Sequence, residues 1–340
     1  MDNLKRKELT AWLCNLLLSL VIYIGFSYAL GAGLFSRYWQ GVLMLVFINI
    51  ILAVSLNLVT GFLGQLTLGH AGFMSVGAYT AALMTKNVLP ETLPRLAALV
   101  IAMLAGGFAA AVCGILIGVP ALRLRGDYIA IITLGFGEII RVIVESMTVT
   151  GGPKGLRGIP KISTLPVAYW TTVVVIVSLA ALIHSRHGRA IMSIREDEVA
   201  AEAAGVNTTF YKSLAFVVSA FMAGLGGAIF AHYTGLLGAT TFNFNRSIEI
   251  LVIVVLGGMG SVTGSVAAAV VLTLLPELLR GFSDYRMLVY SVLLVVMMIV
   301  KPGGLLGRHE FKLSRLIDAA RGRVKKKGNK GDKGDKEVAS

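Results

Sequence analysis

Residues 60–80 read TGFLGQLTLGHAGFMSVGAYT, a stretch that an ordinary lipid-facing helix would not contain. Glycine interrupts it at five positions, namely Gly61, Gly64, Gly69, Gly72 and Gly77. Polar side chains lie between the glycines, at Gln65, Thr67, His70 and Ser75. Backbone that leaves a helix inside a membrane must find hydrogen-bond partners in protein or water, so such a stretch lines a cavity or forms a tight contact between helices. The sequence leaves both readings open.

The rest of the chain is apolar enough to place this stretch in a membrane. Of its 340 residues, 56% are hydrophobic and 14% are charged, which is too apolar for a water-soluble domain. Apolar runs lie at about 11–30, 41–60, 66–84, 95–119, 127–146, 166–184, 211–234, 247–259, 264–280 and 286–301. Because a helix needs about 20 apolar residues to cross a bilayer, these runs predict an all-α, polytopic membrane protein with about ten transmembrane helices. Whether the third and eighth runs cross the membrane is left open.

The distribution of basic residues predicts the orientation. If the N-terminus lies in the cytoplasm, the inner segments carry more than twice as many Lys and Arg residues as the outer loops. Lys and Arg resist transfer across the bilayer. We therefore expect both termini in the cytoplasm.

A second glycine-rich segment lies in the other half of the chain. Residues 257–265 read GGMGSVTGS and contain a GxxxG spacing. Two such segments, one in each half, are typical of an internal repeat around a central pathway. The sequence thus predicts an inverted repeat of two five-helix halves.

Two ionisable residues stand inside an apolar run, in GFGEIIRVIV. Glu138 and Arg141 are three residues apart, so on a helix they share a face and can pair. A structural ion pair near the middle of the membrane is one reading, and a contact with a transported substrate is the other. His70 has the corresponding alternatives, with a buried, hydrogen-bonded histidine as the default.

The loop TGGPKGLRGIP, residues 150–160, combines turn-forming Gly and Pro with two cations. Counting the runs places it on the outer side. It could receive an outer partner or form part of a gate.

The long inner loop after the sixth run predicts a short surface helix over residues 193–205. Ser193 and Glu196 have the spacing of a capping box, acidic residues 196–198 favour a helix N-terminus, and Gly205 followed by Asn207 supplies a stop. The side chains from Val199 to Ala204 are mostly small, so the helix could enter a groove on a soluble partner. An interfacial amphipathic helix is the alternative, although such helices usually carry bulky apolar anchors.

The sequence lacks the motifs of nucleotide hydrolases, zinc proteases and serine hydrolases. The chain has no GxxxxGK[ST] phosphate loop, no HExxH and no GxSxG. Cys14 and Cys113 lie in apolar runs without CxxC spacing, so we expect neither a disulfide framework nor a metal site. We expect no enzyme activity and no cofactor.

The net charge of +13 gathers partly in the tail. Residues 308–340 carry eleven Lys and Arg against five Asp and Glu, with few apolar residues. We expect this segment to be a disordered cytoplasmic tail that follows a transmembrane domain of residues 1–307. We expect this charge to be solvated, with a contact to anionic lipid headgroups as the alternative; the lipid bilayer, and not nucleic acid, is the expected partner of the chain.

The chain resembles the LivM-type permeases, the membrane subunits of branched-chain amino acid ABC importers, over residues 40–308. The resemblance is carried by SLNLVTGFLGQLTLGHAGFMSVGAY (55–79), LRLRGDYIAIITLGFGEIIR (122–141), TGGPKGLRGIP (150–160), GRAIMSIREDEVAAEAAGVN (188–207), VLGGMGSVTGS (255–265) and KPGGLLG (301–307). It implies a bacterial inner-membrane importer of leucine, isoleucine or valine. It also implies three kinds of companion: a second, LivH-like permease, two cytoplasmic ABC ATPases that bind the ATP, and a periplasmic or lipid-anchored substrate-binding protein.

The segments described above supply the expected functional residues of such an importer. Importer permeases carry a loop with the pattern Glu-Ala-Ala, three residues, Gly, and here Val199 replaces the Glu. The expected ATPase-coupling residues are Ser193, Glu196, Asp197, Glu198, Ala200, Ala201, Ala203, Ala204 and Gly205. The expected pathway residues are Asn57, Gln65, Thr67, His70, Ser75, Glu138, Gly257 and Gly258. An importer of urea or short amides is the alternative within the family, and an ion-coupled secondary transporter is the alternative from another class.

Overall fold

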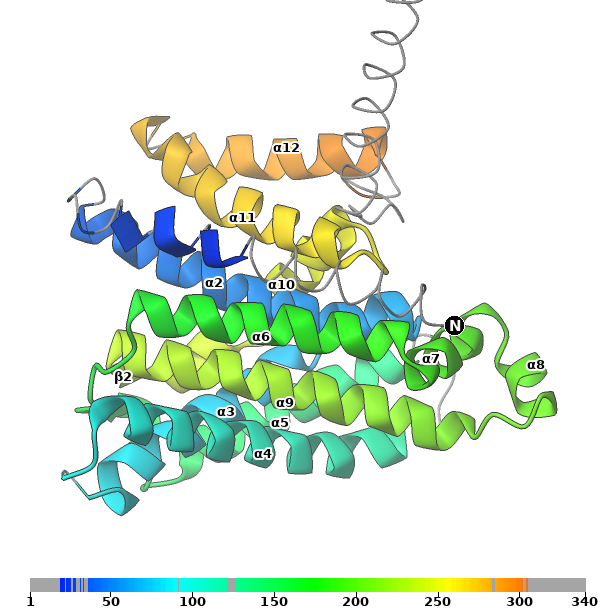
Figure 1. The fold of residues 1–340 in the computed structure, drawn as a ribbon, viewed down its shortest axis with the longest axis horizontal. Helices are drawn as coiled ribbons and strands as arrows, with labels where there is room; N and C mark the ends of the chain where they lie inside the picture. Colours follow the sequence, from blue (N-terminus) through cyan, green and yellow to red (C-terminus); the bar gives the residue numbers. More distant parts are fainter. Residues whose placement is uncertain are drawn as a thin grey trace, which may run out of the picture. The chain divides into compact units, whose positions relative to one another are not determined.

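Helices form wherever the sequence is apolar in the described part of the chain (Figure 1). The computed structural model describes residues 36–90, 92–121, 126, 128–282, 285–301 and 304, and before these only 19–21, 23–25, 27, 28, 31 and 33. The helices are α2 (Arg37–Asn57), α3 (His70–Leu83), α4 (Arg95–Ala121), α5 (Tyr128–Ser146), α6 (Leu165–His184), α7 (Arg186–Glu196), α8 (Glu198–Ala203), α9 (Thr208–Thr234), α10 (Phe244–Gly257), α11 (Val262–Leu278) and α12 (Arg286–Val300). The predicted all-α class is confirmed.

Each predicted apolar run from residue 41 onward overlaps one of these helices. The first predicted run, 11–30, lies mostly outside the described residues, and the predicted tail, 308–340, lies wholly outside them. Contacts group residues 35–309 into one compact unit, which contains every helix from α2 to α12. The predicted inverted repeat stays a prediction.

Five helical segments in the described residues are long and apolar enough to cross a membrane. They are Arg37–Phe62, Arg95–Pro120, Leu165–His184, Thr208–Thr234 and Val262–Gly281. Helices α3 and α10 have 14 residues each, so each is about 21 Å long and shorter than the hydrocarbon core of about 30 Å. These are the third and eighth runs. The count of ten crossings stays a prediction.

Helix α9 packs against α2, α3 and α4, and α2 also packs against α6 and α11. Glycine lets three of these backbones touch. A Cβ added at Gly77 of α3 would lie 2.3 Å from the Cα of Gly224 in α9, and one added at Gly106 of α4 would lie 2.5 Å from the Gly77 carbonyl oxygen. Small residues allow such close approach between membrane helices.

The two ends of the helices carry different structures (Figure 1). Helices α7 and α8 lie at one end. At the other end, β1 (Leu156–Arg157) pairs antiparallel with β2 (Leu236–Leu237). Lys86 Nζ also donates a hydrogen bond of 3.0 Å to the Arg157 carbonyl. The loop 150–160 is therefore tied to two other segments, while its expected role as a gate or docking site stays a hypothesis.

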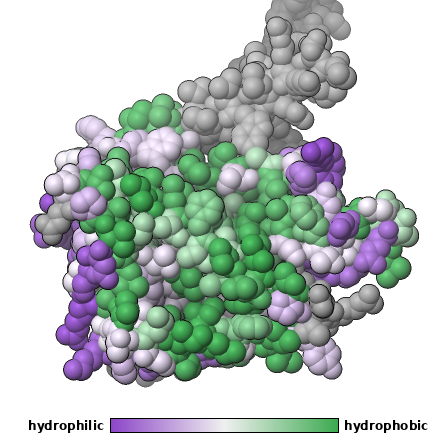
Figure 2. All heavy atoms as spheres, turned by 90° about the horizontal axis from the view of Figure 1, so that it is seen from below, coloured by the Kyte–Doolittle hydropathy of each residue, from purple (hydrophilic) through white to green (hydrophobic). Residues whose placement is uncertain are grey.

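Figure 2 shows one face on which hydrophobic residues fill the middle and hydrophilic residues gather at the ends. Large apolar side chains are exposed on the long helices, including Phe108 (63%) and Leu116 (68%) on α4 and Val174 (59%) on α6. So large an apolar surface is unfavourable in water. Lipid is the solvent that suits it.

Candidate functional site

Two breaks in the helices meet inside the protein. Helix α2 continues as a π-helical turn, Leu58–Phe62, and the chain then runs without helix to His70. Residues 258–261 likewise separate α10 from α11. The fully buried Asn57 joins the two breaks: its Nδ2 donates to the Ser261 carbonyl and to Ser265 Oγ, and its Oδ1 accepts from the Gly260 amide, each at 2.9 Å. We call residues 57–64 and 257–265 the glycine junction.

The glycines of this junction bring backbone against backbone. A Cβ added at Gly61 would lie 2.2 Å from the backbone nitrogen of Gly260. One added at Gly264 would lie 2.1 Å from the Gly257 carbonyl oxygen. Of the two readings that the sequence left open, the structure shows the tight contact at these positions. Gly257 and Gly258 are both buried here, and their place in a pathway stays a prediction.

The non-helical segment before α3 finds its hydrogen-bond partners in protein. The amide of Leu68 donates to Thr133 Oγ1 on α5 (3.0 Å), and in the first turn of α3, which follows, the amide of Ala71 donates to Ser247 Oγ on α10 (3.1 Å). Backbone that leaves a helix at membrane depth needs such partners. Within this segment Thr67 is buried and Gln65 is half-buried.

His70 is buried and hydrogen-bonded, which is the first of the two interpretations of the sequence. It is 2% exposed, and its Nε2 lies 2.8 Å from Ser55 Oγ on α2. The Oγ of Ser75 and the Oε1 of Gln65 are also buried, but neither atom has a hydrogen-bond partner among the described residues. These two oxygens are unpaired polar atoms at expected pathway positions.

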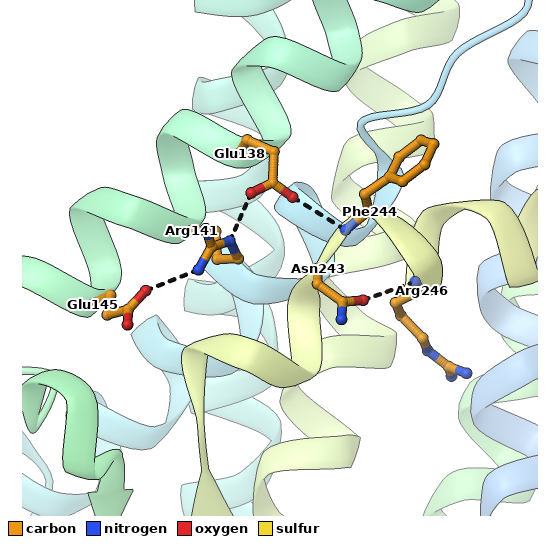
Figure 3. A network of polar contacts seen from close by, with 6 residues as sticks. All are labelled: Glu138, Arg141, Glu145, Asn243, Phe244 and Arg246. Carbon is orange, nitrogen blue, oxygen red and sulfur yellow. Dashed lines mark hydrogen bonds and ion pairs between the residues drawn. The ribbon is translucent and has the colours of Figure 1, made fainter.

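Helix α5 carries a network of charges (Figure 3). The predicted pair is confirmed: Arg141 Nε lies 2.6 Å from Glu138 Oε2. Arg141 also pairs through Nη1 with Glu145 Oε2 at 2.8 Å, and the Phe244 amide donates to Glu138 Oε1 at 3.1 Å. Phe244 is the first residue of α10, so the Glu138 carboxylate accepts one of the amides that a helix N-terminus leaves free. Its predicted contact with a substrate is not tested by this geometry.

A further polar link escaped the sequence reasoning. Arg246 on α10 donates through Nη2 to Asn49 Oδ1 (2.6 Å), and Asn49 Nδ2 donates to Thr273 Oγ1 on α11 (2.9 Å). Asn49 thus connects three helices. An amide inside the apolar run 41–60 was the signal that could have found it.

The predicted surface helix over 193–205 is wrong in its start. Ser193 lies in the last turn of α7, and its Oγ donates to the Ala190 carbonyl (2.9 Å) instead of accepting from a backbone amide as an N-cap would. The chain breaks at Asp197, whose Oδ1 accepts from the amides of Val199 and Ala200 and so caps α8. Asp197 starts α8 in place of the Ser193–Glu196 box because α7 continues to Glu196 and so keeps Ser193 inside a helix. The predicted stop is correct, since α8 ends before Gly205, which has a φ of 83°.

Helix α8 is held to α9 by side chains. Lys212 is 3% exposed and its Nζ lies 2.7 Å from Glu198 Oε1, while Thr208 Oγ1 donates to Glu202 Oε1 at 2.6 Å. Ala201 faces inward. Ala200 and Ala203 of this helix are exposed, as are Ala204 and Gly205 after it, and Glu198 is half-buried. A lysine at the start of the run 211–234 was the sequence signal for the link to α9.

Replacing Lys212 with methionine is expected to loosen α8. Glu198 would lose its partner, and hydrogen exchange of the α8 amides should rise about tenfold, which corresponds to about 1.4 kcal/mol of local opening. Hydrogen exchange with mass spectrometry on the purified protein measures this. Lys154→Met in the opposite loop serves as the control. Exchange in α8 equal to wild type would show that the helix holds its place without the ion pair.

Comparison with known proteins places the chain in a family. The family model described as "Branched-chain amino acid transport system / permease component" matches residues 38–301. The high-affinity branched-chain amino acid transport system permease protein LivM of Escherichia coli (strain K12) is 38% identical over 322 residues, which cover 84% of this chain and 74% of LivM. The corresponding permease protein LivH of the same strain is 30% identical over 153 residues, 44% of this chain and 49% of LivH.

The autoinducer 2 import system permease protein LsrC of Yersinia pseudotuberculosis is 27% identical over 234 residues, covering 61% of this chain and 66% of LsrC. No solved structure matches the chain significantly. The resemblance expected from the sequence motifs is confirmed. Because the family model spans α2 to α12 and LivM is similar over most of the chain, this protein belongs to the family of branched-chain amino acid transport system permease components.

Proposed function

We propose that this chain is the LivM-type permease subunit of an ATP-driven importer of branched-chain amino acids in the bacterial inner membrane, with both termini in the cytoplasm. The observation that carries the proposal is the family match over residues 38–301 together with the similarity to LivM. The relatives are named as permease proteins, and this sequence has no phosphate loop. ATP hydrolysis then belongs to partner subunits.

The companions are a second permease, two cytoplasmic ABC ATPases and a substrate-binding protein. The similarity to LivH, a permease named for the same transport system, supports a paired permease. The exposed face of α8 supports the ATPase contact: Val199 is 66% exposed, and Ala200 and Ala203 on the same helix are also exposed. A narrow helix of this kind fits a groove on a soluble partner.

The pathway runs between this chain and its sister, past the segments 65–75 and 257–265. Exposed residues beside buried ones support this placement. Leu66 is 36% exposed and Met259 is 48% exposed, although their neighbours Thr67 and Gly258 are buried. A sister subunit would cover this surface. Movement of residues 193–205 by the ATPases would then change which side of the membrane the pathway faces.

Reconstitution in liposomes tests the proposal. The chain is combined with its candidate sister permease, ATPases and binding protein, and uptake of labelled leucine, isoleucine, valine and urea is followed with and without ATP. We expect ATP-dependent accumulation of the three amino acids and stimulation of ATP hydrolysis by them.

Each other outcome selects a different function. ATP-dependent uptake of urea in place of leucine would identify an importer of small amides. Uptake by the chain alone under an ion gradient, with no ATPase present, would identify a secondary transporter and overturn the proposal.

A further inference from the structure

An arginine of the expected coupling region reaches the glycine junction. Arg195 lies in the last turn of α7, and its Nη1 donates a 2.6 Å hydrogen bond to the carbonyl oxygen of Gly61. The side chain is 19% exposed. Gly61 belongs to the π-helical turn that ends α2, where the last carbonyls of a helix lack partners from their own helix. The arginine supplies a charged donor to one of them, which gives a stronger hydrogen bond than a neutral donor would.

The same side chain lies against both halves of the junction. A Cβ added at Gly64 would lie 2.5 Å from Arg195 Cγ, and one added at Gly260 would lie 2.9 Å from Arg195 Nη1. Gly64 and Gly260 also have positive φ angles, 78° and 86°. These two glycines therefore leave the room that the arginine occupies. Its guanidinium lies where the break after α2 and the break before α11 come together.

The arginine is linked just as directly to α8. One residue, Asp197, separates the end of α7 from the start of α8. Its side chain caps α8, so the end of α7 cannot stay in place if α8 is displaced far. The ion pair of Arg195 with Glu196 is at the surface, since the Glu196 side chain is 67% exposed. Such pairs contribute little, so the contact with Gly61 is the one that positions the guanidinium.

We propose that Arg195 is a positioning residue that transmits movement of α8 to the glycine junction. This inference rests on the proposed function as an ATP-driven importer. A partner that displaces α8 moves the last turn of α7, and the guanidinium then shifts the Gly61 carbonyl and the turn at Gly260. Asn57 joins the same two turns, so the two breaks change their arrangement together. Arg195 contacts no substrate in this scheme.

Arg195→Met tests the proposal because methionine keeps an unbranched stem but cannot donate to Gly61. In the reconstituted importer, the variant should still hydrolyse ATP, while the amount of substrate moved per ATP falls about tenfold, the factor expected for one charge-assisted hydrogen bond. Arg195→Lys keeps a cationic donor and should recover part of the ratio. Arg189→Met is the matched control, since Arg189 lies on the same helix, is exposed, and donates to the His184 carbonyl away from the junction.

A measurement on the unmodified complex covers the case in which Arg195→Met fails to assemble. Hydrogen exchange at residues 58–64 and 258–261 should differ between the nucleotide-free and the ATP-bound wild-type complex. In Arg195→Lys the difference should shrink. The proposal is overturned if hydrogen exchange of the wild-type complex at both segments is the same with and without ATP. It is also overturned if Arg195→Met moves as much substrate per ATP as the wild type. If the wild-type complex itself shows no ATP-dependent uptake, the proposed function is wrong, and the role of Arg195, which rests on it, is wrong with it.

Discussion

Gly77→Ala is expected to lower the thermal unfolding midpoint of the purified protein strongly, or to prevent folding. The added methyl group would meet the backbone of Gly224 at 2.3 Å, and a backbone cannot move aside as the tip of a side chain can. Helix α9 would have to separate from α3, and with it from α4. Overpacking of this kind costs about 1–3 kcal/mol and more where the neighbour is rigid. Thermal unfolding in detergent, monitored by circular dichroism or fluorescence, measures the effect.

The same substitution at Gly135 is the matched control. Gly135 is also a helical glycine, in α5, but a Cβ there has no atom within 4 Å. Alanine loses less conformational freedom than glycine on folding, so Gly135→Ala should leave the free energy of unfolding unchanged or raise it by up to about 1 kcal/mol. The unfolding midpoint should then stay the same or rise. Equal effects at the two positions would mean that the backbone contact of α3 with α9 does not limit stability.

Asn57→Leu is expected to have the second large effect. Leucine is similar in volume, but it leaves the Gly260 amide without its partner and removes one donor from the Ser261 carbonyl, which keeps the amide and hydroxyl of Ser265. A buried polar group that loses its partner costs about 1–3 kcal/mol. We therefore expect a lower unfolding midpoint and, in the reconstituted importer, a loss of uptake, because the two breaks are no longer joined.

Asn87→Leu controls for the loss of an amide as such, since Asn87 is exposed near the opposite end of the helices. It should change neither midpoint nor uptake. Wild-type stability and uptake in Asn57→Leu would remove the glycine junction from any account of the mechanism.

Local patterns in the sequence predicted the helices well. A run of apolar residues must be helical in lipid, because the helix is the structure in which one segment satisfies its own backbone hydrogen bonds. The runs 66–84 and 247–259 were already the uncertain crossings, and they overlap the 14-residue helices α3 and α10. The pairing of Glu138 with Arg141 was likewise local, since it needs only a helix and a spacing of three residues.

Competition between local signals limited the prediction of the coupling region. Two helix starts are reasonable from the sequence. One is the capping box of Ser193 with Glu196, and the other is an N-cap at Asp197, four residues after Ser193. Which one caps depends on where α7 stops, and α7 is extended to Glu196 by the burial of Ile191 and Ile194 against the rest of the protein. Burial of that kind cannot be read from the local sequence.

By itself the sequence determined the class of the protein, the positions of its helices and its family, because hydropathy and motifs act over short distances along the chain. Only the tertiary structure decided why glycine occupies residues 61, 64 and 260, since the atoms that require it belong to Asn57, Arg195 and Gly260, up to about two hundred residues away in sequence. A glycine in the sequence indicates that a side chain would not fit there, but it does not indicate which atoms lie against it. Packing supplies that information, and here it joins the end of α7 to the two breaks of the glycine junction.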